Sequence, residues 1–187
     1  EALNQDDVVA IAIATRPDCL GDDVLDLLEE INNKVYLWIE LGLQTSNDET
    51  AKRINRGYKL EVFEEAMEKL KERNIDVVVH DILGLPGETK EDMLKTIEYI
   101  AQSGAKGIKF HLLHLMKQTP MVKVYDKGEL EFLSQEDYID LITKGIAMLP
   151  KEMVVHRLTG DAPRELLIGP MWSLKKWEVL NSIDKAL

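Results

Sequence analysis

Polar side chains interrupt the apolar runs of this sequence at a few places, and these are the residues that could do chemistry. All four histidines and one carboxylate fall in such runs: Glu40, His80, His111, His114 and His156. Burying a polar group costs free energy unless a partner satisfies it, so the set indicates a site, although any single member could be a satisfied core residue. Imidazole and carboxylate groups are general acids and bases, and we predict catalytic roles for Glu40, His111 and His156.

The spacing of these residues argues against a metal centre. His111 and His114 are three positions apart, so on a regular strand they face opposite ways. The single cysteine, Cys19, allows neither a disulfide nor a cysteine-ligated zinc or iron–sulfur site, and we interpret it as structural. We therefore predict no metal ligands in this chain.

Side chains two positions apart on a strand share a face, which groups the candidates further. Glu40 shares a face with Gln44 if its strand extends that far. His80 shares a face with Ile82 and Gly84. Gly84 also opens a Gly-Leu-Pro-Gly turn, where the backbone can approach a ligand closely. The turn is neither a dinucleotide-binding fingerprint nor a nucleophile elbow, so by itself it is a weak signal.

Basic side chains close to strand ends suit an anionic substrate. We predict substrate contacts from four residues: Arg16, His80, Lys117 and Arg157. The chain as a whole is acidic, with 23 Lys and Arg against 34 Asp and Glu and a net charge of −11. Such a surface repels phosphate backbones, so nucleic acid is not indicated as a partner of this segment.

Short apolar runs alternate with amphipathic runs along the chain, which predicts alternating strands and helices. Strands are predicted at 8–14, 35–41, 75–83, 107–115 and 153–158. Helices are predicted at 22–32, 48–55, 60–74, from Thr89 onward, at 134–149 and from Ser173 onward. This order implies parallel strands with crossover helices, and the polar strand ends then converge at one edge.

The predicted fold class is therefore α/β, as an open parallel sheet or as an incomplete TIM-like (β/α) barrel. A closed barrel of eight units needs about 250 residues, whereas this chain has 187. We interpret residues 1–187 as a single domain, with barrel units over 1–118 and a C-terminal extension over 119–187.

The chain begins at Glu1, which favours residues missing upstream over a processed start. The run 8–14 would then be an exposed apolar edge strand, through which two copies could pair as a homodimer. The sequence has no apolar run of membrane-spanning length and no signal peptide. With one cysteine, it suits a reducing compartment, so we predict a cytoplasmic protein without a membrane partner.

Five segments, in this order, carry a resemblance to a known family. They are ATRPDCL, ELGLQTSNDETAKRINRGY, VHDILGLPGETKEDM, KFHLLHLMKQTPM and HRLTGDAPRELL. Together they resemble the radical S-adenosylmethionine (SAM) superfamily, in the branch of the elongator catalytic subunit and biotin-synthase-like proteins, and within it a bacterial subgroup of undefined substrate. The resemblance covers essentially the whole chain, and the motifs are specific jointly rather than singly.

The resemblance implies a partial barrel with SAM and a [4Fe–4S] cluster at the C-terminal ends of the strands, with the first barrel strands missing from this chain. It implies a ribose-side motif at Gln44 with Ser46 nearby. It implies that Ile82 packs on adenine, that Gly84 belongs to the same motif, and that the fourth strand, around Leu113, passes near the adenine. His80 and Glu88 depart from the motif, which weakens a role for Glu88.

The family's cluster ligands, C-x-x-x-C-x-x-C, are absent and lie upstream in family order, so the cluster ligands are expected outside this chain. We expect a catalytically incomplete portion of an enzyme that cleaves SAM with an electron from an external donor. The resulting 5′-deoxyadenosyl radical abstracts hydrogen from an unknown substrate. Two alternatives remain open: a hydrolase or lyase using Glu40 and a histidine as acid and base, and a non-catalytic binding or assembly domain.

Overall fold

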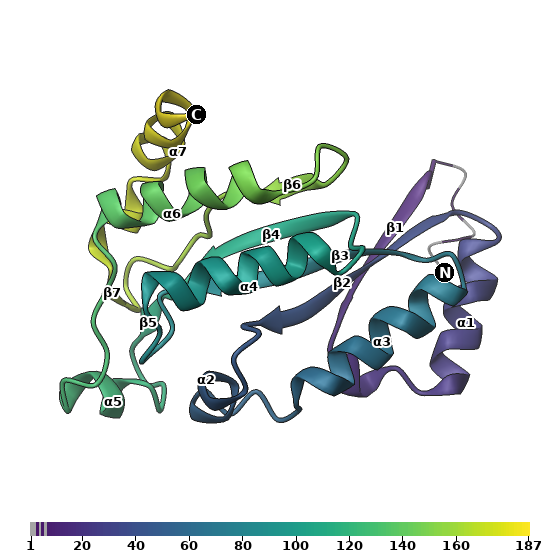
Figure 1. The fold of residues 1–187 in the computed structure, drawn as a ribbon, viewed down its shortest axis with the longest axis horizontal. Helices are drawn as coiled ribbons and strands as arrows, with labels where there is room; N and C mark the ends of the chain where they lie inside the picture. The colour runs from purple at the N-terminus through teal and green to yellow at the C-terminus, as the bar shows by residue number, and fades with distance from the viewer. Residues whose placement is uncertain (1–2, 4, 6) are drawn as a thin grey trace.

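A computed structural model describes residues 3, 5 and 7–187, and a five-stranded sheet forms its centre (Figure 1). The strands are β1 (Ala10–Thr15), β2 (Tyr36–Gln44), β3 (Asp76–Leu83), β4 (Gly107–Leu112) and β6 (Val154–Arg157). They lie in the order β1-β2-β3-β4-β6, and each neighbouring pair is parallel. The predicted α/β class and parallel sheet are confirmed.

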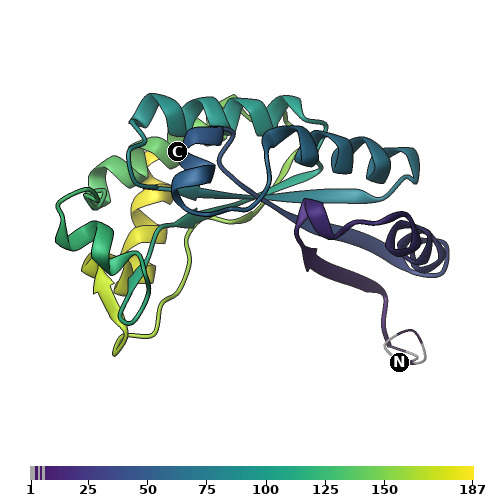
Figure 2. The same ribbon diagram turned by 90° about the horizontal axis from the view of Figure 1, so that it is seen from below.

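Helices connect successive strands of this sheet. They are α1 (Asp22–Asn32), α2 (Asp48–Arg53), α3 (Leu60–Glu72), α4 (Lys90–Gln102) and α6 (Gln135–Met148). Figure 2 shows α3 and α4 over the convex side of the curved sheet, while the concave side between β1 and the C-terminal segments is open. A curved parallel sheet with helices outside is the arrangement of a partial (β/α) barrel.

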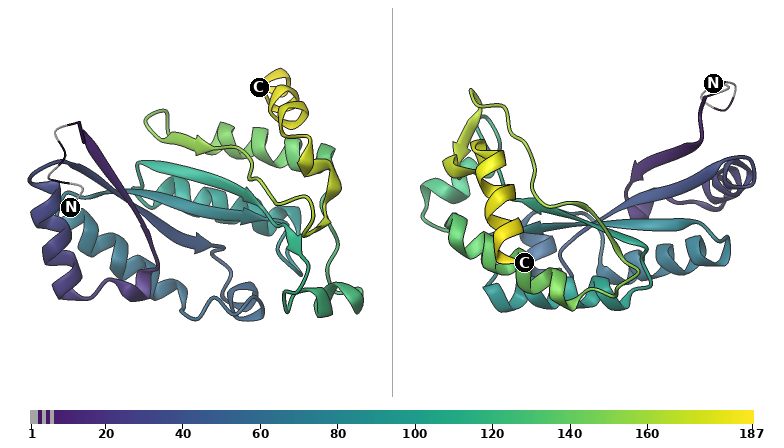
Figure 3. Two further views of the ribbon diagram at one scale, coloured as in Figure 1. Left: turned by 180° about the vertical axis from the view of Figure 1, so that it is seen from behind. Right: turned by 90° about the horizontal axis from the view of Figure 1, so that it is seen from above.

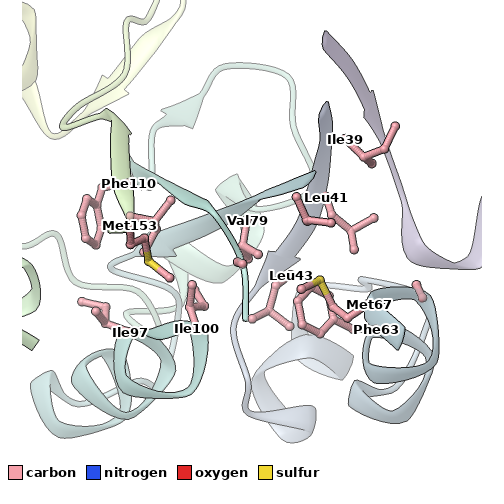
Figure 4. Close-up of a cluster of buried hydrophobic side chains, with 14 of the residues drawn as sticks. Ile39, Leu41, Leu43, Phe63, Met67, Val79, Ile97, Ile100, Phe110 and Met153 are labelled. Atoms are coloured by element: carbon pink, nitrogen blue, oxygen red, sulfur yellow. The ribbon is translucent and has the colours of Figure 1, made fainter. Parts of the chain in front are cut away.

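The helices bury the outward-facing residues of the strands, and this layer is the hydrophobic core. The outward set of β2 is 0% exposed at every position: Leu37, Ile39, Leu41 and Leu43. Figure 4 shows Phe110 of β4 facing Ile97 and Ile100 of α4. On the opposite face of β1, Ala12 and Ala14 are exposed. Each strand therefore gives one face to the helices and the other to the concave side.

Side-chain caps define where two of the helices begin. Thr89 accepts a hydrogen bond from the N–H of Asp92, and the Asp92 carboxylate accepts one from the N–H of Thr89 at 3.0 Å. Ser134 accepts from the N–H of Asp137 at 3.0 Å at the start of α6. These caps satisfy N–H groups that the first turn of a helix leaves unpaired. The helix starts predicted at Thr89 and near residue 134 are confirmed.

The chain beyond β4 departs most from the sequence-based expectation (Figure 3). The strand expected over 107–115 ends at Leu112, and β5 (Leu115–Met116) pairs antiparallel with β7 (Leu167–Gly169). The irregular stretch that follows contains the short helix α5 (Val122–Asp126). Elements of two to five residues are too short to carry a periodic pattern, so the sequence did not predict them.

Several element boundaries also differ from expectation. β1 begins at Ala10 rather than at residue 8, and β2 continues to Gln44 because β3 still pairs with it there. The last helix, α7 (Lys176–Ala186), follows a 3₁₀ turn at Met171–Leu174 rather than starting at Ser173.

None of the helices in the described part of the chain has both the length and the apolar character needed to cross a bilayer. The division at residue 118 stays a prediction.

We expect Phe110→Ala to lower the free energy of unfolding by about 3–5 kcal/mol, because Phe110 is fully buried between the sheet and its helices. Urea unfolding followed by circular dichroism measures this loss. Trp177→Ala is the matched control, since Trp177 is 77% exposed and its removal should change the free energy by no more than about 0.5 kcal/mol. Equal losses in the two variants would contradict the assignment of the core.

Candidate functional site

Apart from Asp81, which is 1% exposed on the helix-covered face of β3 and has no hydrogen-bond partner at Oδ2, the polar residues that interrupt β2, β3 and β4 lie on the concave face of the sheet. On β2, β3 and β4 these residues alternate with the buried outward set, so they face the open side. The strand register places His80 beside Lys109, and Ile82 beside His111. Glu40, on β2, lies beside Val78, which is two residues before His80 on β3. We call Glu40, His80, Lys109 and His111 the inner-face cluster.

Polar contacts join three members of the cluster. Nζ of Lys109 lies 2.5 Å from Oε1 of Glu40, and Nε2 of His80 lies 3.1 Å from Oε2 of the same carboxylate. The side chains of Glu40 and Lys109 are only 14% and 16% exposed, so water screens this ion pair weakly. The attraction is therefore stronger than in a surface pair, and it offsets the cost of desolvating both charges.

Lys109 keeps Glu40 ionised. Burial by itself would raise the pKa of Glu40, but the hydrogen bond and charge of Lys109, with a smaller contribution from His80, lower it below its ordinary value. Burial lowers the pKa of His80, although Glu40 acts in the opposite direction, so the ring is neutral at pH 7. The Glu40 carboxylate can only accept a hydrogen bond, so Nε2 of His80 carries the ring proton and Nδ1 is unprotonated.

His111 extends the cluster toward the end of β4. Its ring centre lies 5.0 Å from that of His80, with the rings tilted by 41°. Burial lowers the pKa of His111 to about 4, and the charges of His80, Arg157 and Lys109 act in the same direction. Nε2 of His111 is buried without a hydrogen-bond partner. The site therefore holds two neighbouring neutral imidazoles, each with an unprotonated ring nitrogen that can act as an acceptor.

Arg157 lies beside Lys109 of this cluster, and His156 lies near the beginning of β4. A register shift in the pairing of β4 with β6 places Arg157 beside Lys109, and its charge helps to lower the pKa of both clustered histidines. His156 instead lies near Trp38, with ring centres 6.3 Å apart, and against Gly107 at the beginning of β4. Burial lowers the pKa of His156, and both Lys109 and Glu40 act on it, so the ring lies within electrostatic reach of the cluster. The predicted catalytic roles of His111 and His156 stay predictions.

The end of β2 is an irregular turn at Gln44. This residue has φ +65°, which non-glycine residues rarely adopt, and the pairing with β3 shifts between Gly42 and Gln44. The Gln44 side chain folds back across Gly42, so a Cβ at position 42 would collide with Nε2 of Gln44. Glycine is therefore required at position 42 for Gln44 to lie where it does.

The turn after β3 brings the other predicted cofactor contacts to the same edge. Gly84 and Gly87 have φ +88° and +81°, which only glycine adopts at little cost. A Cβ on Gly84 would lie 3.8 Å from Cβ of Leu113, so these two residues are neighbours. Ile82 precedes them on the inner face. Convergence of the strand ends at one edge is confirmed, and the cofactor roles of these residues stay predictions.

Ser46 follows the irregular turn at the end of β2, and α4 holds it in place. Its Oγ lies 3.0 Å from Oγ1 of Thr96 in α4, and its N–H donates to the same oxygen at 3.1 Å. Thr45 donates to Glu88 at 2.5 Å across the same gap. These bonds fasten the end of β2 to α4 and its preceding turn. The hydroxyl of Ser46 thus has a structural partner already.

The predicted substrate contacts divide into two groups. His80 and Arg157 belong to the inner face, as described above. Arg16 pairs with Asp18 at 2.6 Å, and its guanidinium lies 5.6 Å from the ring centre of Tyr58. Lys117 donates to the backbone oxygen of Glu165 at 2.8 Å, beyond β5. The structure does not bring Arg16 and Lys117 to the inner-face cluster.

Across residues 3, 5 and 7–187, no group of three or more His, Cys, Asp or Glu side chains is arranged to hold a metal ion. His114 lies beside Gly160, past the end of β4, and Cys19 is exposed with a free thiol. The expectation that this chain holds no metal ligands stays a prediction.

Sequence reasoning missed Lys109, Arg56 and Tyr58. Lys109 shares strand parity with His111, and that signal could have grouped the two. Arg56 and Tyr58 lie between α2 and α3, where no periodicity marks a residue as buried. Arginine is rarely buried, yet the Arg56 side chain is 2% exposed, so its sequence gives no cue to its position.

Two hollows flank the sheet without entering its concave face. One, of about 680 Å³, lies between α3 and α4 and includes Phe63, Met67 and Tyr99 in its lining. The other, of about 430 Å³, borders the turn 84–88 and Phe132. Only the smaller hollow adjoins the strand ends where the cofactor contacts are predicted.

The lowered pKa of His111 should make folding sensitive to acid. The unfolded residue binds a proton near pH 6.5 and the folded residue only near pH 4, so its contribution is present above pH 6.5 and is lost as the pH falls toward 4. We expect wild type to lose about 1–3 kcal/mol more stability than His111→Phe between pH 7 and pH 4.5. Urea unfolding at both values checks this, and parallel losses in the two proteins would contradict it.

Known proteins share both the sequence and the fold of this chain. Residues 1–100 match the radical SAM superfamily, and residues 105–187 match the radical SAM C-terminal domain. YtqA of Bacillus subtilis is 55% identical over 185 residues, covering 99% of this chain. The chain spans 58% of the length of YtqA.

Solved structures agree on the architecture. Elp3 of Methanocaldococcus infernus, with its N-terminus deleted, matches 95% of this chain and 42% of its own at a TM-score of 0.81 and 22% identity. TsrM of Kitasatospora setae, with cobalamin and a [4Fe–4S] cluster bound, matches 95% of this chain and 46% of its own at a TM-score of 0.61 and 13% identity. These likenesses show a common fold, and since the superfamily match spans more than half of the sequence, the chain belongs to the radical SAM superfamily.

Proposed function

We propose that this chain forms the SAM- and substrate-facing part of a radical SAM enzyme whose cluster ligands lie outside residues 1–187. The observation that carries the proposal is the inner-face cluster, which lies on the concave side of a partial barrel beneath the strand ends of Gln44 and Gly84. When bound, SAM and a reduced [4Fe–4S] cluster supply a 5′-deoxyadenosyl radical that abstracts hydrogen from a substrate.

The residues at the strand ends suit the nucleoside of SAM. Gln44 offers an amide at the end of β2, where a ribose hydroxyl would find donor and acceptor groups. Ile82 supplies apolar surface for adenine on the inner face, and Gly84 with Leu113 lets the backbone approach the ring. Ser46 contributes by holding the turn, because its hydroxyl already contacts α4.

The chain's own residues do not suit the iron–sulfur cluster. Such clusters are held by several cysteine thiolates, and this chain contains only Cys19. We therefore assign no step of the chemistry to cluster ligands within this chain. An external donor is required to reduce the cluster, and a reducing cytoplasm suits that electron transfer. Because SAM is cleaved reductively, we class the enzyme as oxidoreductase-like.

The inner-face cluster would manage protons and charge during turnover. His80 accepts a proton at Nδ1, since its Nε2 proton is engaged by Glu40. Glu40 stabilises the imidazolium that forms, and Lys109 keeps Glu40 ionised throughout. His111 adds a second neutral imidazole to the site, with its ring centre 5.0 Å from that of His80. Arg157 supplies an unreactive positive charge for an anionic part of the substrate.

The Glu40–His80 hydrogen bond also favours a second candidate, an acid–base hydrolase or lyase. A carboxylate that orients an imidazole is the minimum arrangement for general base catalysis. This candidate needs neither SAM nor a cluster. Formation of 5′-deoxyadenosine distinguishes the two, because only the radical reaction produces it.

The test uses the full-length protein, reconstituted anaerobically with iron and sulfide and supplied with SAM and dithionite. We expect 5′-deoxyadenosine well above a no-protein control, measured by liquid chromatography. Replacing the expected upstream cluster cysteines with alanine should abolish it. Cys19→Ala is the matched control and should retain product formation, since Cys19 is exposed and far from sufficient to hold a cluster. Absence of both cluster absorbance and product in wild type would overturn the radical function and leave the acid–base candidate.

A further inference from the structure

The segment Arg56–Gly57–Tyr58, between α2 and α3, is built against the end of β2. We propose that Tyr58, anchored by Arg56, is a positioning residue that orients the Gln44 amide toward SAM. The inference rests on the proposed function, because it assumes that Gln44 contacts the nucleoside. Its physical basis is a set of contacts that join the three residues to the irregular turn of β2.

Arg56 binds the backbone of the turn at the end of β2. Its Nη1 donates to the backbone oxygens of Leu43 at 3.0 Å and Thr45 at 2.6 Å, on both sides of Gln44. Its Nη2 donates to Asp48 at 3.0 Å, and to the backbone oxygen of Tyr58 at 2.9 Å. A guanidinium with 2% exposure that binds carbonyls on either side of one residue constrains the backbone of that residue.

Tyr58 lies between two guanidinium groups. The Arg56 guanidinium is 4.6 Å from its ring centre and that of Arg16 is 5.6 Å away. Gly57 makes room for this arrangement, since it has φ +93° and a Cβ there would lie 3.1 Å from Nη2 of Arg16. These two contacts restrict the motion of the ring and therefore of its hydroxyl.

The Tyr58 hydroxyl reaches the two residues that define the turn. Its single proton is shared between the backbone oxygen of Gly42 and Oε1 of Gln44, which lies 3.2 Å from the hydroxyl oxygen. Burial raises the pKa of Tyr58, although Arg56 opposes the effect, so the hydroxyl keeps its proton and remains a donor. Because Tyr58 engages Oε1, the Nε2 group of Gln44 lies over Gly42. Gln44 therefore presents N–H donors suited to an acceptor oxygen such as a ribose hydroxyl.

Tyr58→Phe tests the proposal, because it keeps the ring between the guanidinium groups and removes only the hydroxyl. On the reconstituted full-length protein we expect the KM for SAM and the dissociation constant of S-adenosylhomocysteine to rise about 3- to 10-fold. The kcat for 5′-deoxyadenosine should change by less than about twofold, since no reacting atom is touched. Tyr125→Phe, on α5 and away from β2, is the matched control and should leave both constants unchanged.

A double-mutant cycle separates positioning from general stability. If Tyr58 acts through Gln44, then adding Tyr58→Phe to Gln44→Ala should raise neither the KM for SAM nor the dissociation constant of S-adenosylhomocysteine any further. Gly42→Ala, which displaces the Gln44 side chain, should reproduce the KM effect of Tyr58→Phe. Additive effects in the cycle, or an unchanged dissociation constant in Tyr58→Phe, would overturn the proposal.

The outcome is distinguishable from failure of the proposed function. Wild type that binds S-adenosylhomocysteine but forms no 5′-deoxyadenosine refutes the radical reaction, while the binding cycle still decides the role of Tyr58. Wild type that binds no S-adenosylhomocysteine refutes both. Wild type with full activity and an unaltered Tyr58→Phe variant refutes only the positioning role.

Discussion

One face of each strand is buried under the helices, and the rest of the structure depends on this constraint. Burying Leu37, Ile39, Leu41 and Leu43 under the helices provides the hydrophobic free energy that holds the sheet together. Because side chains alternate along a strand, the residues between them must face the concave side. Polar groups on that side stay close to water, whereas Asp81, which β3 turns toward the helices, is 1% exposed and has no partner for Oδ2. The inner-face cluster is the chemical consequence of that division.

The Lys109–Glu40 ion pair is the centre of the cluster. A carboxylate in this half-sheltered position would otherwise take up a proton more readily, because burial favours its neutral form. Lys109 reverses that preference, and the ionised carboxylate then selects one tautomer of His80. One lysine thus determines the charge of Glu40, and Glu40 determines which nitrogen of His80 is free. The four members act as a unit rather than as separate residues.

The parallel sheet, most helices and the convergence of strand ends followed from apolar runs, caps and the order of elements. Glu40, His80 and His111 were recognisable because polar side chains in apolar runs need partners. The position of His156 relative to the cluster was not, since it depends on where along its neighbour the strand β6 begins to pair. The roles of Arg56 and Tyr58 depend on contacts between a loop and a strand end, and no local pattern in sequence encodes such contacts.

The open concave face has a thermodynamic consequence for whatever occupies it. A ligand that covers His80 and His111 without placing a negative charge beside them removes water from them, and desolvation disfavours their protonated forms further. Protons and such a ligand therefore compete for the same surface, even where no ligand atom touches an imidazole nitrogen. Thermodynamic reciprocity requires that protonation lower the affinity for the ligand by the same factor by which the ligand lowers the affinity for protons. The shape of the sheet thus makes occupancy of the site a function of pH.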